Sequence, residues 1–250
     1  MIDFHTHILH GMDDGSDSIE ASVRMLEKAY RRGTDMAVLT PHCYPKTNDD
    51  IIRFVEYRNE GFEQLKKACT GKRVPEMLLG AEVNICSPFA ELREIHKLCI
   101  ENTDYMLVEM PAGIWTDWMI DTVYNLTLKG IKPIIAHIDR YINFPKSRLE
   151  ALDECKPLYQ VNADAFLTSY GRRVVLEFYK RGMIHILGSD VHNGKVRRKN
   201  TLCNAYIKLE ENFGPEYLEF IRHNGKCVLE NRDVCRKTDF PKTIKHKFFF

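Results

Sequence analysis

A regular alternation of short apolar runs with longer segments of helical spacing is the feature that most limits how this chain can fold. Seven apolar or β-branched runs recur along the 250 residues, at 2–5, 35–40, 76–83, 105–110, 132–137, 158–162 and 184–189. Segments with helical apolar spacing follow them, at 18–33, 48–70, 88–97, 116–129, 146–155, 170–181, 197–212 and 215–223. This order predicts parallel β/α units.

Seven parallel strands are enough to close a barrel. No glycine-rich phosphate-binding turn follows the first strand, as a nucleotide-binding doubly wound sheet would need. The sequence therefore favours an α/β fold of the distorted (β/α)7 TIM-like barrel type. Because no internal repeat or linker-like change in composition occurs, residues 1–250 are expected to form one domain, with a loosely packed basic and aromatic tail over about 236–250.

The composition argues against several classes of partner. Lysine and arginine total 36 against 35 aspartates and glutamates, so no overall field attracts nucleic acid or an anionic membrane. No stretch has the roughly 18 uncharged apolar residues that a membrane span needs, and the first residues are unlike a signal peptide, so a cytoplasmic location is expected. The eight cysteines lack C-x-x-C spacing and are expected to be reduced.

Residues that can bind metal follow nearly every predicted strand. In a β/α barrel the carboxyl ends of the strands surround one pocket. The residues at those positions are His5, His7, His42, Glu82, Glu109, His137, Asn162, Asp190 and His192. Each alone could be a loop residue or a satisfied polar group, but a carboxylate inside an apolar strand needs a cationic partner. The whole set predicts imidazole and carboxylate ligands for two or three Zn, Mn or Fe(II) ions.

Two further parts of the sequence suit a phosphate ester. The turn "HGMDDG" offers Asp13 or Asp14 as another ligand; Asp14 is preferred, although either could belong to an ordinary Asp-Gly turn. Arg140 and Arg197 follow predicted ligands closely, and an arginine fork can bind phosphate oxygens. Covalent chemistry is disfavoured, because no cysteine has an arginine six positions on and neither a G-x-S-x-G elbow nor a P-loop occurs.

Seven motifs occur along the chain in this order: "MIDFHTHILHGMDDG", "TPHCYP", "GAEV", "LVEMP", "IIAHIDRY", "QVNADAF" and "GSDVHN". On these motifs the sequence resembles the PHP (polymerase and histidinol phosphatase) domain over nearly the whole chain. More narrowly, the chain is similar to the bacterial metal-dependent protein tyrosine phosphatases encoded with capsule and exopolysaccharide synthesis genes. His10 and Cys43 stand where other residues are more usual, and His10 could offer an extra donor near the site.

This resemblance implies the PHP barrel with a trinuclear centre, usually of manganese. The implied ligands are His5, His7, Glu82 and Asp190 for one ion, Glu82, Glu109 and His137 for the second, and Asp14, His42 and His192 for the third. Arg140 and Arg197 match the phosphate-binding arginines of the family. The implied activity is hydrolysis of phosphotyrosine by a metal-bound hydroxide, with the tail of a bacterial tyrosine kinase that regulates polysaccharide synthesis as the protein substrate.

Three alternatives stay open. The chain could be a small-molecule PHP phosphatase such as histidinol phosphatase, or a metal-bearing PHP module without catalytic activity. It could also be a metal-dependent amidohydrolase, since that superfamily also opens with H-x-H after its first strand. Amidohydrolases usually bridge their metals with a carboxylated lysine, and Glu82 occupies the bridging place here.

Overall fold

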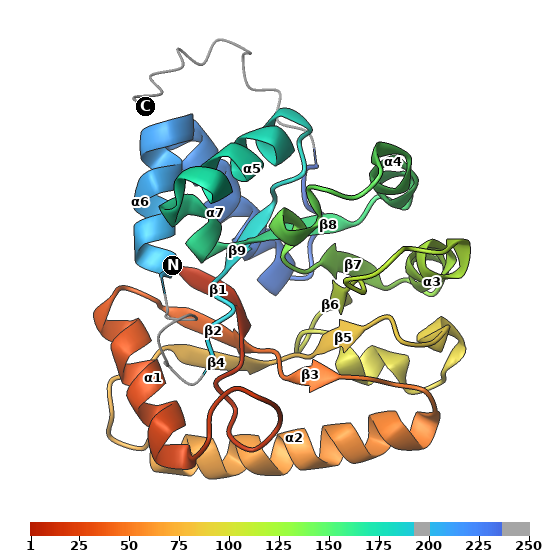
Figure 1. The fold of residues 1–250 in the computed structure, drawn as a ribbon. Coiled ribbons are helices and arrows are strands. Elements are labelled where there is room, and N and C mark those ends of the chain that lie inside the picture. Colours follow the sequence, from red (N-terminus) through yellow and green to blue (C-terminus); the bar gives the residue numbers. More distant parts are fainter. Residues whose placement is uncertain (193–200, 237–250) are drawn as a thin grey trace.

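In the computed structural model of this protein, residues 1–192 and 201–236 are described. Parallel strands form a ring with helices outside it (Figure 1). The strands are β1 (Ile2–Thr6), β2 (Met36–Leu39), β3 (His42–Cys43), β4 (Glu76–Leu79), β5 (Glu82–Asn84), β6 (Tyr105–Glu109), β7 (Lys132–Ile135), β8 (Leu158–Asn162) and β9 (Ile186–Gly188). Their order is β1-β2-β4 in one sheet and β3-β5-β6-β7-β8-β9 in the other.

The two sheets meet at two seams, which complete the ring. At one seam, the Asp190 amide donates to the carbonyl of His5 (2.8 Å) and the His7 amide donates to Val191 (2.9 Å), which joins the end of β9 to β1. At the other seam, the region predicted as one strand at 76–83 is divided, because β4 pairs with β2 whereas β5 pairs with β3 and β6. The result is the predicted distorted barrel with seven strand positions.

The helices lie where the apolar spacing predicts them, with two corrections. They are α1 (Ile19–Arg31), α2 (Asn48–Ala68), α3 (Asp117–Leu128), α4 (Lys146–Glu154), α5 (Ser169–Lys180), α6 (Leu202–Phe213) and α7 (Pro215–Leu229). Short 3-10 turns add η1 (Phe89–Glu91), η2 (Ile95–Leu98), η3 (Ile138–Tyr141) and η4 (Ala163–Leu167). The first part of the helix predicted at 197–212, including Arg197, lies outside the described residues, as does nearly all of the predicted tail.

The two corrections have physical causes. The helix predicted at 88–97 is wrong: the chain forms η1 and η2 there, because Phe89, Ile95 and Leu98 are all buried in an arrangement that a single helix does not provide. The last helix does not stop near residue 223 but continues to Leu229. Gly225 allows this helix to lie against β1, since a side-chain carbon at that position would stand 3.1 Å from the Phe4 ring.

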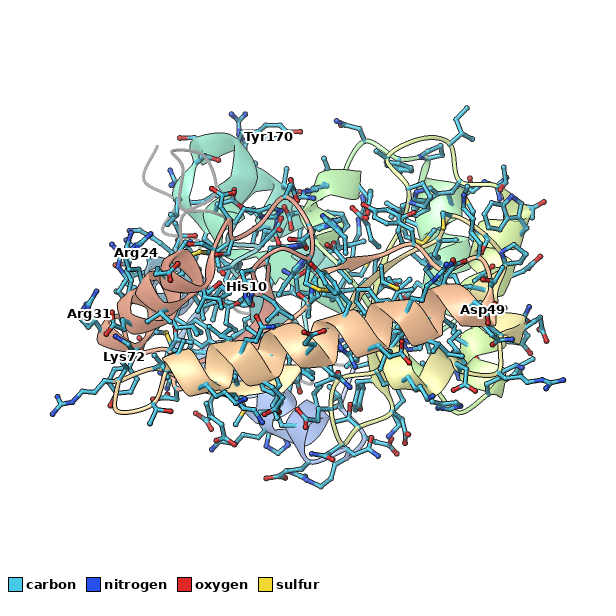
Figure 2. All side chains as sticks on the ribbon, turned by 90° about the horizontal axis from the view of Figure 1, so that it is seen from below. His10, Arg24, Arg31, Asp49, Lys72 and Tyr170 are labelled. Atoms are coloured by element: carbon cyan, nitrogen blue, oxygen red, sulfur yellow. The ribbon has the colours of Figure 1, made fainter. Side chains whose placement is uncertain are left out.

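Side-chain caps fix where the first two helices begin. The Ser18 hydroxyl accepts from the Ala21 amide at the start of α1. At the start of α2, Thr47 and Asp50 form a capping box, an arrangement that stabilises a helix N-terminus by about 1 kcal/mol. Figure 2 shows α2 running across one side of the barrel, from Asp49 in its first turn toward Lys72, which follows its last residue. His10 lies beside α2, near Gly61.

The barrel interior is apolar at the amino-terminal end of the strands. One cluster of buried residues combines strands on all sides of the ring with α7, and its members include Phe4, Val38, Leu107, Ile134, Ile186 and Val228. A second, larger cluster packs between the strands and the surrounding helices. Polar side chains are thus left to the carboxyl-terminal end, where water and ligands can enter.

A bulge in β1 allows two consecutive side chains to face the barrel interior. Asp3 pairs with Ala37 and Thr6 pairs with Leu39, so β1 has one more residue than β2 between these pairs. Such an insertion redirects a side chain locally. Phe4 can therefore join the apolar cluster while its neighbour His5 joins the polar site.

Two sequence predictions can be compared directly with the structure. No helix in the described part of the chain is both long and apolar enough to cross a membrane. The eight cysteines are free thiols, as predicted.

The buried His185 gives a pH-dependent contribution to stability that can be measured. Burial and the nearby Arg236 lower the pKa of His185 from 6.5 to about 4. The unfolded chain therefore binds this proton at a higher pH than the folded chain. The stabilisation is complete above pH 6.5 and is lost as the pH falls toward 4. We expect His185→Asn, whose amide can still accept from the Tyr159 amide, to remove up to about 3 kcal/mol of pH dependence.

The measurement is urea unfolding of metal-free protein at several values between pH 7 and pH 4.5. His96→Asn, at an exposed position, is the control. Parallel curves for His185→Asn and the unsubstituted protein would contradict the assignment.

Candidate metal centre

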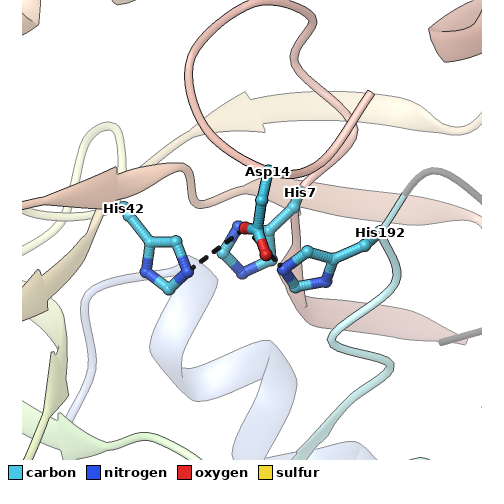
Figure 3. Close-up of side chains that lie close together, drawn as sticks. All are labelled: His7, Asp14, His42 and His192. Atoms are coloured by element: carbon cyan, nitrogen blue, oxygen red, sulfur yellow. Dashed lines mark ion pairs between the residues drawn. The ribbon is translucent and has the colours of Figure 1, made fainter. Parts of the chain in front are cut away.

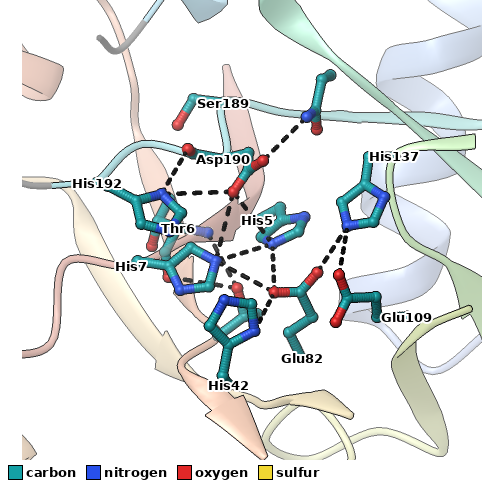
Figure 4. Close-up of polar contacts among 12 residues, drawn as sticks. His5, Thr6, His7, His42, Glu82, Glu109, His137, Ser189, Asp190 and His192 are labelled. Atoms are coloured by element: carbon teal, nitrogen blue, oxygen red, sulfur yellow. Dashed lines mark hydrogen bonds and ion pairs between the residues drawn. The ribbon is translucent and has the colours of Figure 1, made fainter. Parts of the chain in front are cut away.

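All nine predicted ligands converge in one network at the carboxyl-terminal end of the barrel, where Figure 4 shows every one of them except Asp14. Ion pairs or hydrogen bonds connect each of them to another member; the members are His5, His7, Asp14, His42, Glu82, Glu109, His137, Asp190 and His192. Arg140 borders this network through an ion pair with Asp190. Arg197 lies outside the described residues.

Glu82 is the centre of the network. Its Oε2 lies 3.2 Å from His5 Nε2, 3.2 Å from His7 Nε2 and 2.9 Å from His42 Nδ1. Its Oε1 lies 2.9 Å from His137 Nε2. Strand register explains part of this geometry, because His42 and Glu82 are direct partners in the β3–β5 pair. Glu82 is the first residue of β5, directly after the break between β4 and β5 that separates the two sheets.

Asp190 approaches the opposite side of the same histidine pair. Its Oδ1 lies 3.6 Å from His5 Nε2 and 3.4 Å from His7 Nε2. Its Oδ2 accepts from the Arg140 guanidinium and, at 3.0 Å, from Nδ2 of the Asn162 side chain. The two oxygens of Asp190 therefore have different partners: one faces the imidazoles and the other is held by neutral and cationic donors.

Asp13 and Asp14, neighbours in the first loop, have different partners, and Figure 3 shows Asp14 among His7, His42 and His192. Asp14 Oδ1 lies 3.1 Å from His192 Nε2 and 3.7 Å from His42 Nε2, among the candidate ligands. Asp13 instead accepts from His7 Nδ1 at 2.6 Å and from the His42 amide at 2.9 Å. Asp13 therefore orients a candidate ligand, while Asp14 is itself placed to bind a cation.

Gly15 makes this loop geometry possible. Its amide donates to Asp13 Oδ1 at 2.9 Å. A side-chain carbon at this position would lie 2.1 Å from the His7 carbonyl oxygen, so only glycine fits. The Asp-Gly turn therefore has both a structural and a positioning role, which the sequence left open.

Glu109 lies at the end of β6, beside Glu82 and His137. Its Oε1 is 3.4 Å from His137 Nε2, and its Oε2 accepts from Nδ2 of the Asn84 side chain at 2.7 Å. Asn84 and Glu109 are register partners in the β5–β6 pair, which accounts for this contact.

Two candidate ligands have left-handed backbone conformations. His137 has φ 32° and Asp190 has φ 49°, values that are unfavourable for residues with a side chain. Both follow the end of a strand, and the unusual turn directs each side chain toward the cluster. Local strain of this kind is typical of functional sites.

The charges of the cluster are strongly coupled. Burial disfavours the charged form of Glu82, yet the imidazoles of His5, His137 and His42 hold its pKa well below the usual range. The pKa of Asp190 is likewise lowered despite burial, by His5, His7 and Arg140.

The imidazoles respond in the opposite direction. Burial alone would lower the pKa of His137, but Glu109 and Glu82 raise it to about 9. The carboxylates of this site therefore favour positive charge on the groups between them. A divalent cation can supply that charge in place of the protons.

The donor geometry and chemistry fit divalent cations. Two ligands at right angles around an ion, with bonds of about 2.1 Å, are about 3 Å apart. The Nε2 atoms of His5 and His7 lie 3.1 Å from each other and 3.2–3.6 Å from carboxylate oxygens of Glu82 and Asp190. Glu82 Oε2 is buried and has no well-aligned hydrogen bond within the described chain, although three imidazole nitrogens surround it.

Three groups of mutually close donors occur among the described residues. They are His7, Asp14, His42 and His192; His5, His7 and Asp190; and His42, Glu82 and Glu109. His7 and His42 belong to two groups each, whereas the resemblance gave each of them to one ion. His137 is in none of the three groups, although its Nε2 lies 2.9 Å from Glu82 Oε1 and 3.4 Å from Glu109 Oε1. His10 is in none of them either.

Sequence reasoning missed one buried polar residue of this region, Gln160. It accepts from His5 Nδ1 at 3.1 Å and from the His137 amide at 2.7 Å. A signal was present, because a glutamine stands inside the otherwise apolar run "LYQV", two positions before Asn162 and hence on the same face of the strand.

Fold and site together define a class of protein: a parallel β/α barrel whose strand ends gather imidazoles and carboxylates suited to divalent cations. The chain belongs to the capsular polysaccharide synthesis family CpsB/CapC, whose family model matches residues 1–230. The resemblance to capsule-associated proteins is thereby confirmed.

Similar proteins of this kind are known from several bacteria. The chain is 30% identical to the tyrosine-protein phosphatase YwqE of Bacillus subtilis, over 100% of this chain and 99% of that protein. It is 26% identical to the tyrosine-protein phosphatase CpsB of Streptococcus agalactiae, over 94% of this chain and 100% of that protein.

A solved structure resembles the whole described barrel. It comes from work on YwqE from Bacillus subtilis and CpsB from Streptococcus pneumoniae, described as unique metal-dependent tyrosine phosphatases. The TM-score is 0.79 at 27% identity, covering 95% of this chain and 97% of the other.

The different positions of Asp13 and Asp14 predict different effects on metal binding. Asp14→Asn should reduce the number of ions bound per chain, because it removes a ligand oxygen. Asp13→Asn should keep that number but weaken binding about 10–100-fold, because it disturbs the orientation of His7. The measurements are metal content by mass spectrometry and affinity by chelator competition.

Asp17→Asn, an exposed change in the same loop, is the control. A full complement of ions in Asp14→Asn together with a lost ion in Asp13→Asn would reverse the assignment.

Proposed function

We propose that this chain is a metal-dependent protein tyrosine phosphatase that acts on phosphotyrosine in a protein. The observation that carries the proposal is the cluster centred on Glu82, whose carboxylate oxygens lie 2.9–3.2 Å from imidazole nitrogens of four histidines at strand ends around the barrel. The phosphatase names of full-length relatives support the same reaction.

The residues have separate roles in this proposal. His5, His7, Asp14, His42, Glu82, Glu109, His137, Asp190 and His192 would hold the cations. Divalent cations at such a site lower the pKa of bound water and neutralise charge on phosphate oxygens. Arg140, 39% exposed at its side chain and oriented by Asp190, would bind a phosphate oxygen as charge accumulates there. Arg197 has the same role in the proposal on sequence grounds alone.

Tyr44 places an exposed aromatic ring beside the metal-binding cluster. Its ring centroid lies 5.9 Å from that of His42, and the residue is 55% exposed. Partial burial and the carboxylates of Glu109 and Glu82 raise the pKa of its hydroxyl. An exposed ring beside a phosphate-binding centre favours an aryl phosphate over an alkyl one.

The finer parts of the proposal rest on the family resemblance. We infer manganese as the working metal, in two or three ions, with iron or zinc as the alternatives. We infer the tyrosine-rich tail of a bacterial tyrosine kinase as the substrate, because the family is one of capsular polysaccharide synthesis. The cytoplasmic location stays a prediction from the sequence.

The reaction is tested with the purified chain and a phosphotyrosine peptide. We expect phosphate release to stop after chelation, to return with Mn²⁺ and to persist after thiol alkylation, because the proposed chemistry uses no cysteine. His137→Ala should lower the activity at least 100-fold. Alkylation-sensitive turnover that resists chelation would overturn the mechanism.

The same preparation separates the alternatives. Faster turnover of histidinol phosphate than of the peptide, at matched Mn²⁺, would favour a small-molecule phosphatase. Undiminished activity in His137→Ala would indicate that a contaminant is responsible and favour the non-catalytic module.

Tyr44 provides a test of substrate class. Tyr44→Ala should raise KM for the phosphotyrosine peptide about tenfold, equivalent to about 1.4 kcal/mol, and leave an alkyl phosphate such as glycerol phosphate nearly unchanged. Tyr44→Phe should behave like the unsubstituted protein, and Tyr124→Ala, an exposed aromatic on α3, is the surface control. Equal losses for both substrates would show that the ring has no part in recognising the aryl group.

A further inference from the structure

We propose that Gln160 and Asn162 form a hydrogen-bonded amide relay that positions three metal-binding residues and thereby sets the affinity of the centre for its cations. The proposal rests on the metal-binding part of the proposed function and not on the phosphatase reaction. Both amides lie on β8 and are buried, with exposures of 0% and 3%.

The relay connects three other strand positions. Gln160 Oε1 accepts from Nδ1 of His5 (3.1 Å), which lies in β1, and from the backbone amide of His137 (2.7 Å), which follows β7. Gln160 Nε2 donates to Asn162 Oδ1 (2.9 Å). Asn162 Nδ2 then donates to Asp190 Oδ2 (3.0 Å), after β9. Each end of the relay is thus a residue of the metal cluster.

The direction of these bonds determines which atoms remain for a cation. An amide oxygen can only accept, so the ring proton of His5 lies on Nδ1 and the lone pair of Nε2 points toward Glu82, 3.2 Å away. At the other end, Asn162 and Arg140 occupy Oδ2 of Asp190 and leave Oδ1 facing the histidines.

The backbone of β9 is shaped around this relay. Gly188 lies in β9, between β8, which carries Gln160, and β1, which carries His5. A side-chain carbon at Gly188 would stand 2.5 Å from His5 Cβ and 2.9 Å from Gln160 Nε2. Only a glycine leaves room for the glutamine to reach His5.

Simple space filling does not explain these two amides. Leu158 lies on the same face of β8, two residues before Gln160, and packs in the apolar interior. An apolar residue would therefore suit β8 here unless the neighbours required hydrogen bonds. The contacts to His5, His137 and Asp190 supply that requirement, as outer partners of metal ligands commonly do.

The first experiment measures metal affinity in the full chain. Gln160→Met, similar in length but without hydrogen bonds, should bind Mn²⁺ about 10–100-fold more weakly in chelator competition. Gln160→Glu keeps an acceptor for His5 and should recover most of that affinity. Asn162→Leu should weaken binding through Asp190, and Gln64→Met, at an exposed position on α2, is the control.

A double-mutant cycle separates positioning from a general structural effect. If Gln160 acts through His5, the affinity losses of Gln160→Met and His5→Ala should be clearly less than additive, whereas those of Gln160→Met and Asp14→Asn should add. Nitrogen-15 NMR of the Zn²⁺-loaded protein should show His5 protonated at Nδ1, and Gln160→Met should lose this fixed tautomer.

Unchanged Mn²⁺ affinity in Gln160→Met would overturn the proposal. So would an affinity loss that Gln160→Glu does not recover and that adds fully to that of His5→Ala. Because each readout is metal binding, the relay stands even if phosphotyrosine is not hydrolysed. A lack of phosphatase activity with an intact relay would overturn only the proposed reaction.

Discussion

The carboxylate of Glu82 lies buried where β5 begins, with imidazole nitrogens of His5, His7, His42 and His137 within 3.2 Å. An isolated carboxylate in this position would cost several kcal/mol, so positive charge must gather around it. Protons on the histidines can provide this charge, and divalent cations provide it better because each carries two. The barrel meets this requirement by bringing histidines from several strand ends to one carboxylate.

The barrel separates an apolar half from a polar half along the same strands. In β6, Leu107 packs inside the ring while Glu109, two residues later on the same face, belongs to the cluster. α7 covers the apolar end through Val228. Water is thus kept from one end of the barrel, and most of the charged groups at the other end lie in strands or directly after them, whereas Asp14 is supplied by the first loop.

Much of this arrangement could be predicted because it depends on periodicity. Apolar runs and helical spacing gave the strand positions and most helices, and the parallel order placed His5, Glu109 and Asp190 at one end of the barrel. The failures were local. The division of 76–83 into two strands and the 3-10 turns at 88–97 depend on which neighbouring segment each residue contacts, and no local pattern records that choice.

The sequence by itself determined the kind of donor and the order of donors along the chain, because side-chain chemistry and strand period are properties of the residues. Only the tertiary structure decided which atoms meet. It directed Asp13 to His7 and Asp14 to His192, turned His5 inward through a bulge, and placed Gln160 beneath His5. The physical reason is range: hydrogen bonds and metal coordination act over about 2–3 Å, whereas the segments that supply these atoms lie far apart in the chain.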